Sequence, residues 1–492
     1  MAITRRQFIK RTGLATAGTL LGPGLFGSPF VRRALADTIG DRYLVVLFLD
    51  GGNDGLNTVT PYDDGTSATL RAHYETNRKI GTGGIRLLQS ELNATRLDGY
   101  GGVNGLDPNT GTPLALHPGF APLFAGSPSA WSAGDVAVIQ GCGYPFYNLS
   151  HDESRRIWRS ANPLSVGAYA GTGWCGRHLA AEYGSTDIPG VCIGGEVAGE
   201  LAQTATGVLS MYDLADFTFP YDDQYSDDVD AKKTAFQALY GSARGNLQPG
   251  VRYIGDTGTA TFNSTELYNA LSTTYDNDTS QDVFRAEWES VNRSTVRDLH
   301  EITKVIYGVS TGAQGGQITA RFFSFDNGGY DTHSDQGGAD PNGQHYGLHN
   351  EVATALDIFR RHSIALGTWN KTLVVVWSEF SRRIPQNDNG TDHGSQGPVL
   401  VLGGGVNGGV YGNHPDIDPN ALDDDENTPY SQNPSDPFRS TDIRDVYGTI
   451  LKHWLNMPVA QITGAGGVLP VDPGTEDPNL TWQSPNLDLG FI

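Results

Sequence analysis

The sequence is poor in cysteine, in long apolar runs and in basic residues, and each shortage narrows what the protein can be. Its three cysteines, Cys142, Cys175 and Cys192, form no CxxC pair and no zinc-knuckle spacing. The common cysteine-based zinc motifs are therefore excluded. An oxidising compartment would permit one disulfide and leave one thiol over, and the alternative is three free thiols. The spacing does not choose between these two states.

Long apolar runs are also missing. A transmembrane helix needs about 18 or more consecutive apolar residues. The N-terminal apolar stretch over 13–26 is too short and too rich in glycine, and no later segment reaches that length. We therefore expect no transmembrane segment.

Basic residues are outnumbered, with 33 Lys and Arg against 55 Asp and Glu, which gives a formal net charge of −22. Such an acidic surface repels nucleic acids and anionic membranes at long range, so we expect no nucleic-acid partner. It suits the capture of cations. The simpler interpretation of the same charge is a solvated acidic surface.

The N-terminus has the layout of an export signal. Arg5 and Arg6 are followed by Phe8, by the short apolar stretch, and by Ala34-Leu35-Ala36, which is an A-x-A cleavage site. The arginine pair resembles the twin-arginine signal, which exports folded proteins. We therefore expect residues 1–36 to be a removed leader, and the mature protein to be periplasmic or secreted.

The remaining residues, 37–492, predict one α/β domain. Apolar runs that are hydrophobic on both faces predict buried, mostly parallel strands, and amphipathic spacing predicts helices between them. We expect a doubly wound sheet with helices on both faces and loop-rich insertions. Residues 200–275 would be an insertion or cap, and 412–440 an acidic loop with a weak Ca²⁺ site at 423–426. The strands are expected at 43–49, 135–140, 189–193, 322–325, 372–377 and 398–402, and the main helices at 280–310, 345–368 and 441–455.

Carboxylates and histidines occur in four blocks of the sequence, which we expect the fold to bring to one edge of the sheet. Asp50 ends the first strand, Asp331 and His333 follow the 322–325 strand, Glu379 follows the 372–377 strand, and Asp392-His393 lies between glycine-containing turns. In open α/β sheets, ligands bind beyond the carboxyl ends of strands. Carboxylate oxygen with imidazole nitrogen suits Zn²⁺ or Mn²⁺, and carboxylates alone suit Ca²⁺ or Mg²⁺. We expect one or two divalent ions at this edge.

Ser150 occupies a position that suits a catalytic nucleophile. Ser150 follows the 135–140 strand and opens a helix, with Glu153 spaced to complete a capping box. Capping alone would explain Ser150, but the free N–H groups of a helix start also stabilise a developing anion. His151, beside it, is a candidate general acid or metal ligand.

The sequence gives weaker evidence for other polar residues as members of the site. Arg382 and Arg383 would clamp an anionic substrate or pair with surface acids. The Asp-Gly-Gly-Asn run after the first strand is also a common turn signal, so the polar residues near it, Asn53, Asn57 and Thr58, are only possible members of the site.

Together these motifs resemble a known family. Asp-Gly-Gly-Asn-Asp-Gly-Leu-Asn, Leu-His-Pro, Ser-His, Gly-Trp-x-Gly-Arg, Gly-Tyr-Asp-Thr-His, Ser-Glu-Phe-Ser-Arg-Arg and Thr-Asp-His-Gly occur in this order between residues 42 and 457. The series resembles the DUF1501 family of twin-arginine-exported bacterial proteins, which is similar to the alkaline-phosphatase-like superfamily.

The resemblance implies specific roles. It implies a metal-binding Asp at Asp50, later metal pairs at Asp331/His333 and Asp392/His393, and a Ser or Thr nucleophile, with Ser150 preferred to Thr58. A further metal-binding His is expected near the C-terminus, and His414 is the nearest candidate. The Asp331-Thr-His333 spacing is shorter than the superfamily's usual pair, and the sulfatase maturation pattern is absent.

We therefore expect an exported, metal-dependent hydrolase of phosphate or sulfate esters, acting on an anionic small molecule or polymer. The alternative is a non-catalytic exported protein that keeps the fold and a structural metal, and binds a polymer or protein partner. An open metal site would favour the first, and a closed shell of ligands the second.

Overall fold

The computed structural model describes residues 42–63, 65, 68–100, 103–145, 147–163, 171–184, 187–203, 206–215, 228–418, 436–437, 439–464, 466–471 and 484–492. The expected leader over 1–36 and the expected Ca²⁺ site at 423–426 lie outside the described residues.

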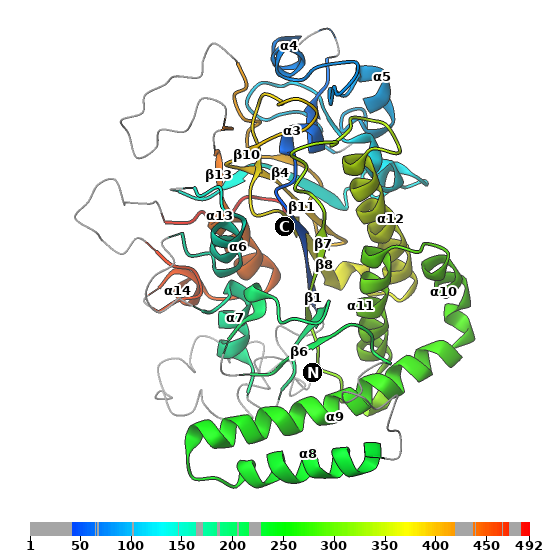
Figure 1. Ribbon diagram of the computed structural model, residues 1–492, viewed down its shortest axis with the longest axis vertical. Helices are drawn as coiled ribbons and strands as arrows, with labels where there is room; N and C mark the ends of the chain where they lie inside the picture. Colours follow the sequence, from blue (N-terminus) through cyan, green and yellow to red (C-terminus); the bar gives the residue numbers. More distant parts are fainter. Residues whose placement is uncertain are drawn as a thin grey trace, which may run out of the picture.

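A nine-stranded, mixed but mostly parallel sheet forms the centre of the fold (Figure 1). Eight strands follow the order β12-β4-β11-β8-β1-β7-β5-β6, and β13 pairs with β4. Only β11 runs against its neighbours β4 and β8. The strands are β1 (Tyr43–Asp50), β4 (Val136–Gly143), β5 (Gly190–Ile193), β6 (Val208–Met211), β7 (Phe322–Gly328), β8 (Thr372–Trp377), β11 (Gly397–Gly403), β12 (Gly409–Tyr411) and β13 (Thr441–Asp442).

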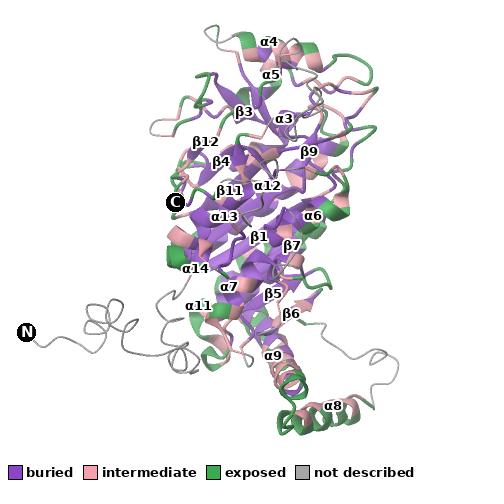
Figure 2. Cartoon of the chain, turned by 90° about the vertical axis from the view of Figure 1, so that its left-hand side faces the viewer, coloured by how far each residue is buried: buried purple, intermediate pink, exposed green. Residues whose placement is uncertain are grey.

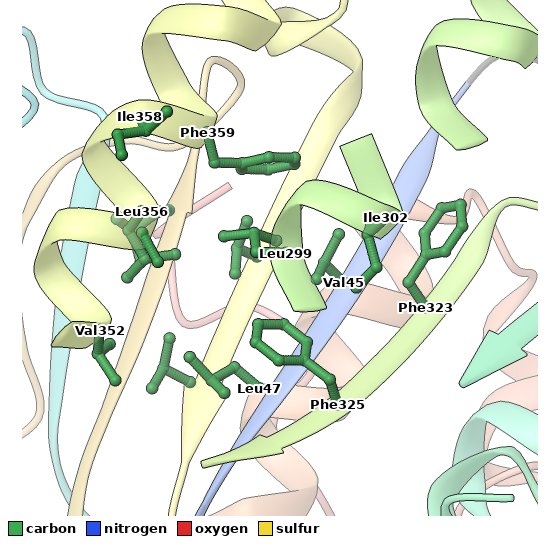
Figure 3. Packing of buried hydrophobic residues seen from close by; sticks show 14 of the residues in the cluster. Val45, Leu47, Leu299, Ile302, Phe323, Phe325, Val352, Leu356, Ile358 and Phe359 are labelled. Carbon is green, nitrogen blue, oxygen red and sulfur yellow. The ribbon is translucent and has the colours of Figure 1, made fainter. Parts of the chain in front are cut away.

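Helices cover both faces of this sheet because its central strands are apolar on both sides. Alternate residues of β1 enter two separate hydrophobic cores, with Val45 and Leu47 in one and Val46 and Phe48 in the other. The first core lies under α11 (Ser294–Thr311) and α12 (Gln344–Ala365), as Figure 3 shows. The second lies under α6 (His151–Ser160), α7 (Trp174–Glu182) and α13 (Ile443–Thr449). The predicted α/β class is thus confirmed, and so is the prediction that the central strands are buried on both faces.

The predicted helix over 280–310 is wrong as a single element. The chain forms α10 (Asp282–Glu289), turns, and begins again at α11. Val283, which the pattern placed on the buried face, is 77% exposed. The break is stabilised from a distant segment, because the Thr295 backbone N–H donates to Glu351 of α12. That contact cannot be seen from local periodicity.

Two helices project from the body of the molecule. Helices α8 (Val229–Arg244) and α9 (Pro249–Asn277) lie side by side, at the end opposite to β9 (Ser381–Arg382) and β10 (His393–Gly394) (Figures 1 and 2). They include much of the segment expected as an insertion or cap. No helix in the described part of the chain is long and apolar enough to cross a membrane.

The remaining elements are short. They are α3 (Gly55–Thr58), β2 (Val59–Pro61), α4 (Ala68–Asn77), α5 (Gln89–Leu92), β3 (Leu114–Leu116), α14 (Val459–Thr463), the 3₁₀ helices η1 (Asn93–Thr95), η2 (Pro118–Phe124), η4 (Gly199–Leu201), η6 (Thr279–Gln281), η7 (Ala313–Gly316) and η8 (Trp369–Lys371), and the π-helical turn η9 (Ile450–Trp454). Asp442 caps the start of α13, where its side chain accepts a hydrogen bond from the Arg444 backbone N–H. All three cysteines are free and buried.

Candidate metal centre

The site lies where the adjacent parallel strands β8, β1 and β7 end. The chain leaves β1 at Asp50, whose carbonyl accepts a hydrogen bond from the Tyr330 N–H after β7, at 3.1 Å. Gly51 has φ +124°, and a Cβ on it would lie 2.4 Å from the backbone nitrogen of Asp331. Only glycine allows this close approach. The β1 turn therefore fixes the position of Asp331.

Three side chains from distant segments meet above these strand ends. One ligand atom each of His151, Asp331 and His393 lies within 4.8 Å of the other two. Asp331 Oδ1 is 3.2 Å from His393 Nε2, and Asp331 Oδ2 is 3.6 Å from His151 Nε2. Two ligands about 2.0–2.1 Å from one tetrahedral Zn²⁺ are ~3.3 Å apart. The two distances from Asp331 to the imidazoles are therefore those of ligands that share one ion.

Each imidazole is oriented by a bond at its other nitrogen. His151 Nδ1 lies 2.7 Å from Glu379 Oε1, and His393 Nδ1 lies 2.8 Å from the Leu149 carbonyl. Both partners accept hydrogen bonds, so both Nδ1 atoms donate, and each Nε2 faces Asp331. This is the arrangement by which proteins fix the tautomer of metal-binding histidines.

Glu379 is itself held in place. Its buried carboxylate accepts from the Gly51 N–H at 3.0 Å, the Gly52 N–H at 3.1 Å and the Ser378 hydroxyl at 3.0 Å. It was expected as a possible metal ligand. The structure places it behind His151, where it supports the imidazole.

The local charges act on the three groups differently. The hydrogen bond to Glu379 raises the pKa of His151, against burial. Burial lowers the pKa of His393. Burial raises the pKa of Asp331, but the hydrogen bond from Arg382 and the positive charge of that guanidinium outweigh it and bring that pKa to about 2. Asp331 is therefore an anion at neutral pH, as a metal ligand must be.

His333 and Asp392 lie at the margin of the group. His333 Nε2 is 3.1 Å from Asp331 Oδ1 and 2.9 Å from His393 Nε2. Its Nδ1 is 3.3 Å from Asp392 Oδ1. The structure thus brings together both sequence pairs, with Asp331 and His393 in the donor group and His333 and Asp392 beside it.

Asp50 lies beside the donor group and is not part of it. Its Oδ1 accepts a hydrogen bond from Arg155 Nη2, one turn along α6 from His151. Burial, opposed by the charge of Arg155, raises the pKa of Asp50. The expected ligand is therefore engaged by a cation from α6, 105 residues away in the sequence.

Arg382 is a structural residue in this geometry. Its guanidinium is fully buried and donates to the carbonyls of Gly51, Gly52, Tyr330 and Thr391, and to Asp331 at 2.7 Å. It joins the loops after β1 and β7. With these donors in use, it is not placed to clamp a substrate. Arg383 is paired with Asp436 at 3.3 Å.

The predicted capping box at Ser150 is wrong. Ser150 does occupy the N-cap of α6, but its side chain makes no capping hydrogen bond. Glu153 does not reach back to it and pairs with Arg156 instead. Ser150 is exposed, and it lies between Leu149 and His151, both of which contact the site. Its hydroxyl is therefore available at a helix start.

The other candidates lie away from the donors. Asn53 and Thr58 belong to a buried hydrogen-bond network with His345 and His349, with Asn53 Oδ1 at 2.9 Å from His345 Nε2 and Thr58 Oγ1 at 3.2 Å from His349 Nε2. Asn57, also buried, bonds the Ile85 carbonyl and the Tyr74 hydroxyl.

His414 is buried elsewhere. Its backbone N–H donates to Asp107 at 2.8 Å, and the residue lines a small cavity together with Gln140 and Ser381. Its predicted role as a further ligand is not supported by this position.

The donor group is open to solvent. The Asp331 side chain is 49% exposed, that of His151 28% and that of His393 19%. A structural metal site normally has a closed shell, whereas a catalytic one keeps a position for water or substrate. The arrangement can hold a cation and leave it accessible.

Two groups that contribute to the site, Arg155 and the Leu149 carbonyl, were not predicted from the sequence. Arg155 had a usable signal, because His151, Arg155 and Arg159 recur every four residues on a predicted helix and so share one face. The Leu149 carbonyl had none, since any residue supplies one.

Comparison with known proteins agrees with part of the expected resemblance. No curated protein matches the chain significantly. Residues 317–429, which run from before β7 to beyond β12 and include Asp331 and His393, match the model of the family described as "Protein of unknown function (DUF1501)".

Proposed function

We propose that this protein is a metal-dependent hydrolase of phosphate or sulfate esters, with His151, Asp331 and His393 holding the ion. The convergence of these three side chains, from segments as far apart as 151 and 393, is the observation that carries the proposal. Side chains brought together from distant segments and oriented by a buried carboxylate are typical of a functional centre.

The donor set fits a particular class of ion. Two imidazoles and one carboxylate suit Zn²⁺ or Mn²⁺ better than Ca²⁺ or Mg²⁺, which prefer oxygen ligands. His333 and Asp392 lie close enough to supply further donors. When bound, such an ion would act as a Lewis acid on the ester oxygen and lower the pKa of a coordinated hydroxyl group or water.

The protein's own residues suit ester cleavage. Ser150 is an exposed hydroxyl beside His151, at the start of a ten-residue helix. The unpaired N–H groups and the dipole at a helix N-terminus stabilise negative charge on a phosphate or sulfate. Ser150 is therefore our proposed nucleophile. Glu379 holds His151 in its tautomer, and Arg382 holds the Asp331 loop.

The exposure of the donors favours this activity over a purely structural metal. A closed shell would have supported the alternative of a non-catalytic protein that keeps the fold. The doubly wound, alkaline-phosphatase-like arrangement also remains part of the proposal. It draws support from a mostly parallel sheet with helices on both faces and from donors beyond the strand ends.

The activity test uses a panel of phosphate and sulfate monoesters with Zn²⁺, Mn²⁺ or Ca²⁺. We expect metal-dependent turnover that Ser150→Ala abolishes without changing the midpoint of thermal unfolding. The matched control is Ser132→Ala, a serine in the loop before β4. Absence of turnover with every ion, or equal turnover by wild type and Ser150→Ala, would contradict the proposal.

We also propose that the protein is exported folded by the twin-arginine route, on the strength of its first 36 residues. Replacing Arg5 and Arg6 by lysine should retain the chain in the cytoplasm in cell fractionation. Unchanged export would contradict this proposal.

A further inference from the structure

One face of α6 carries three cationic or imidazole side chains, one turn apart. His151, Arg155 and Arg159 are separated by four residues each, which is about 6 Å along a helix. All three point toward the end of the sheet, where each meets a carboxylate. The contacts are His151–Glu379 at 2.7 Å, Arg155–Asp50, and Arg159–Asp326 at 3.0 Å.

These carboxylates follow the order of the sheet. Glu379 comes just after β8, Asp50 ends β1 and Asp326 lies near the end of β7, and these three strands are neighbours in that order. Neighbouring strands are about 4.8 Å apart, close to the rise of one helical turn. Helix α6 therefore crosses the strand ends with one pair for each strand.

The two arginines differ in how many acidic side chains they pair with and in how exposed they are. The Arg159 side chain is only 16% exposed and pairs with two acids, the fully buried Glu200 at 3.2 Å and Asp326. Arg155 is 31% exposed, and within the described part of the chain its ion pair is with Asp50 alone, through Nη2, while its Nε has no hydrogen-bond partner there. Asp50 is itself 38% exposed. Solvent-exposed pairs of this kind contribute little free energy, so Arg155 can exchange Asp50 for another anion at low cost.

We propose that Arg155 is the residue that binds the anionic oxygens of the substrate. This inference rests on the proposed function and names the side chain that would recognise a phosphate or sulfate group held at His151, Asp331 and His393. A planar guanidinium binds two oxygens of such a group at once. Asp50 then acts as the internal anion that orients Arg155 until a substrate replaces it.

Other arginines near the site are less suited to this role. Arg382 is buried with its donors on backbone carbonyls and Asp331. Arg383 is held by the buried Asp436. Arg156 is exposed, but it pairs with Glu153 on the helix surface. Among the described arginines, Arg155 combines proximity to His151, partial exposure and one partly exposed carboxylate partner.

The test is the binding of inorganic phosphate and of sulfate to the full-length protein loaded with Zn²⁺, measured by titration calorimetry. Arg155→Gln should weaken phosphate binding by about 10-fold or more, since it removes charge-assisted hydrogen bonds. Arg156→Gln changes the net charge equally and should stay within about two-fold of wild type. Arg155→Lys, which keeps the charge and loses the planar fork, should be intermediate.

The outcomes separate this inference from the proposed function. Equal phosphate binding by Arg155→Gln and Arg156→Gln would overturn the role of Arg155, and so would a wild type that holds Zn²⁺ but binds neither anion. A wild type that takes up neither Zn²⁺ nor Mn²⁺ would overturn the proposed function. The same pair of variants, titrated without metal, would then still decide whether Arg155 binds anions.

Discussion

Replacing Glu379 by glutamine tests how much the metal centre depends on the carboxylate behind it. Glu379 accepts hydrogen bonds from two backbone N–H groups, the Ser378 hydroxyl and His151 Nδ1. An amide of the same shape has only one accepting oxygen, and its NH₂ group faces donors. At least one buried donor then loses its partner, and His151 loses the charge that fixes its tautomer.

The magnitudes follow from these contacts. Replacing an outer-shell partner typically costs 10- to 100-fold in metal affinity, which is about 1.4–2.7 kcal/mol. A buried donor facing an amide NH₂ group costs about 1–3 kcal/mol of stability. We therefore expect Glu379→Gln to bind Zn²⁺ at least 10-fold more weakly and to lose about 2 kcal/mol in the free energy of unfolding.

The assay is a Zn²⁺ titration against a competing chelator, with denaturant unfolding of the metal-free protein run in parallel. Glu153→Gln is the matched control, because it makes the same change at an exposed residue in the first turn of α6. The reasoning is refuted if Glu379→Gln binds Zn²⁺ as tightly as Glu153→Gln does.

Two further changes probe the surroundings of the site. Burial lowers the pKa of His345 to about 3, while the unfolded chain protonates it near 6.5. Stability should therefore fall as the pH drops below about 6.5, by about 2 kcal/mol at pH 5 for this residue alone. In urea unfolding at pH 7 and pH 5, His345→Gln should lose about 2 kcal/mol less than wild type between the two pH values, and an equal loss would contradict the argument. Gly51→Ala should lower metal affinity and stability together, because its Cβ would collide with the backbone of Asp331. Gly347→Ala, at a helical position with open space around it, is the control for a chelator titration and a thermal melt. A Gly51→Ala protein with wild-type affinity would refute the close approach.

The sequence was sufficient to predict the structure of those segments in which one local pattern determines the conformation. The run 43–49 is apolar on both faces, so it could only be a buried strand with helices on both sides, and β1 is that strand. The Asp and His residues after β7 and before β11 were also expected to share one site. Asp331 and His393 do so, because β7 ends, and the antiparallel strand β11 begins, at the same edge of the sheet.

Where the observed contacts of Asp50 and Glu379 differ from the expected ones, the reason is a partner that local sequence does not reveal. Asp50 was expected to bind metal, but a carboxylate also pairs with a nearby basic side chain. In the folded protein Arg155 of α6 is that side chain, and it forms an ion pair with Asp50. Glu379 was a possible ligand, yet two backbone N–H groups after β1 hold it in the interior. The capping box failed for a local reason, since Glu153 pairs with Arg156, three residues further along the same helix. The positions of Asp50 and Glu379, in contrast, depend on contacts that exist only after folding.

The most direct test of the metal centre is X-ray absorption spectroscopy of the full-length protein loaded with Zn²⁺. We expect about one ion per chain, bound by nitrogen and oxygen ligands that include at least two imidazoles, and we expect His393→Ala to lose the ion. His453→Ala, which removes a histidine paired with the exposed Asp488, should keep it. A spectrum without imidazole ligands, or equal zinc content in His393→Ala and His453→Ala, would contradict the assignment of His151, Asp331 and His393 as the site.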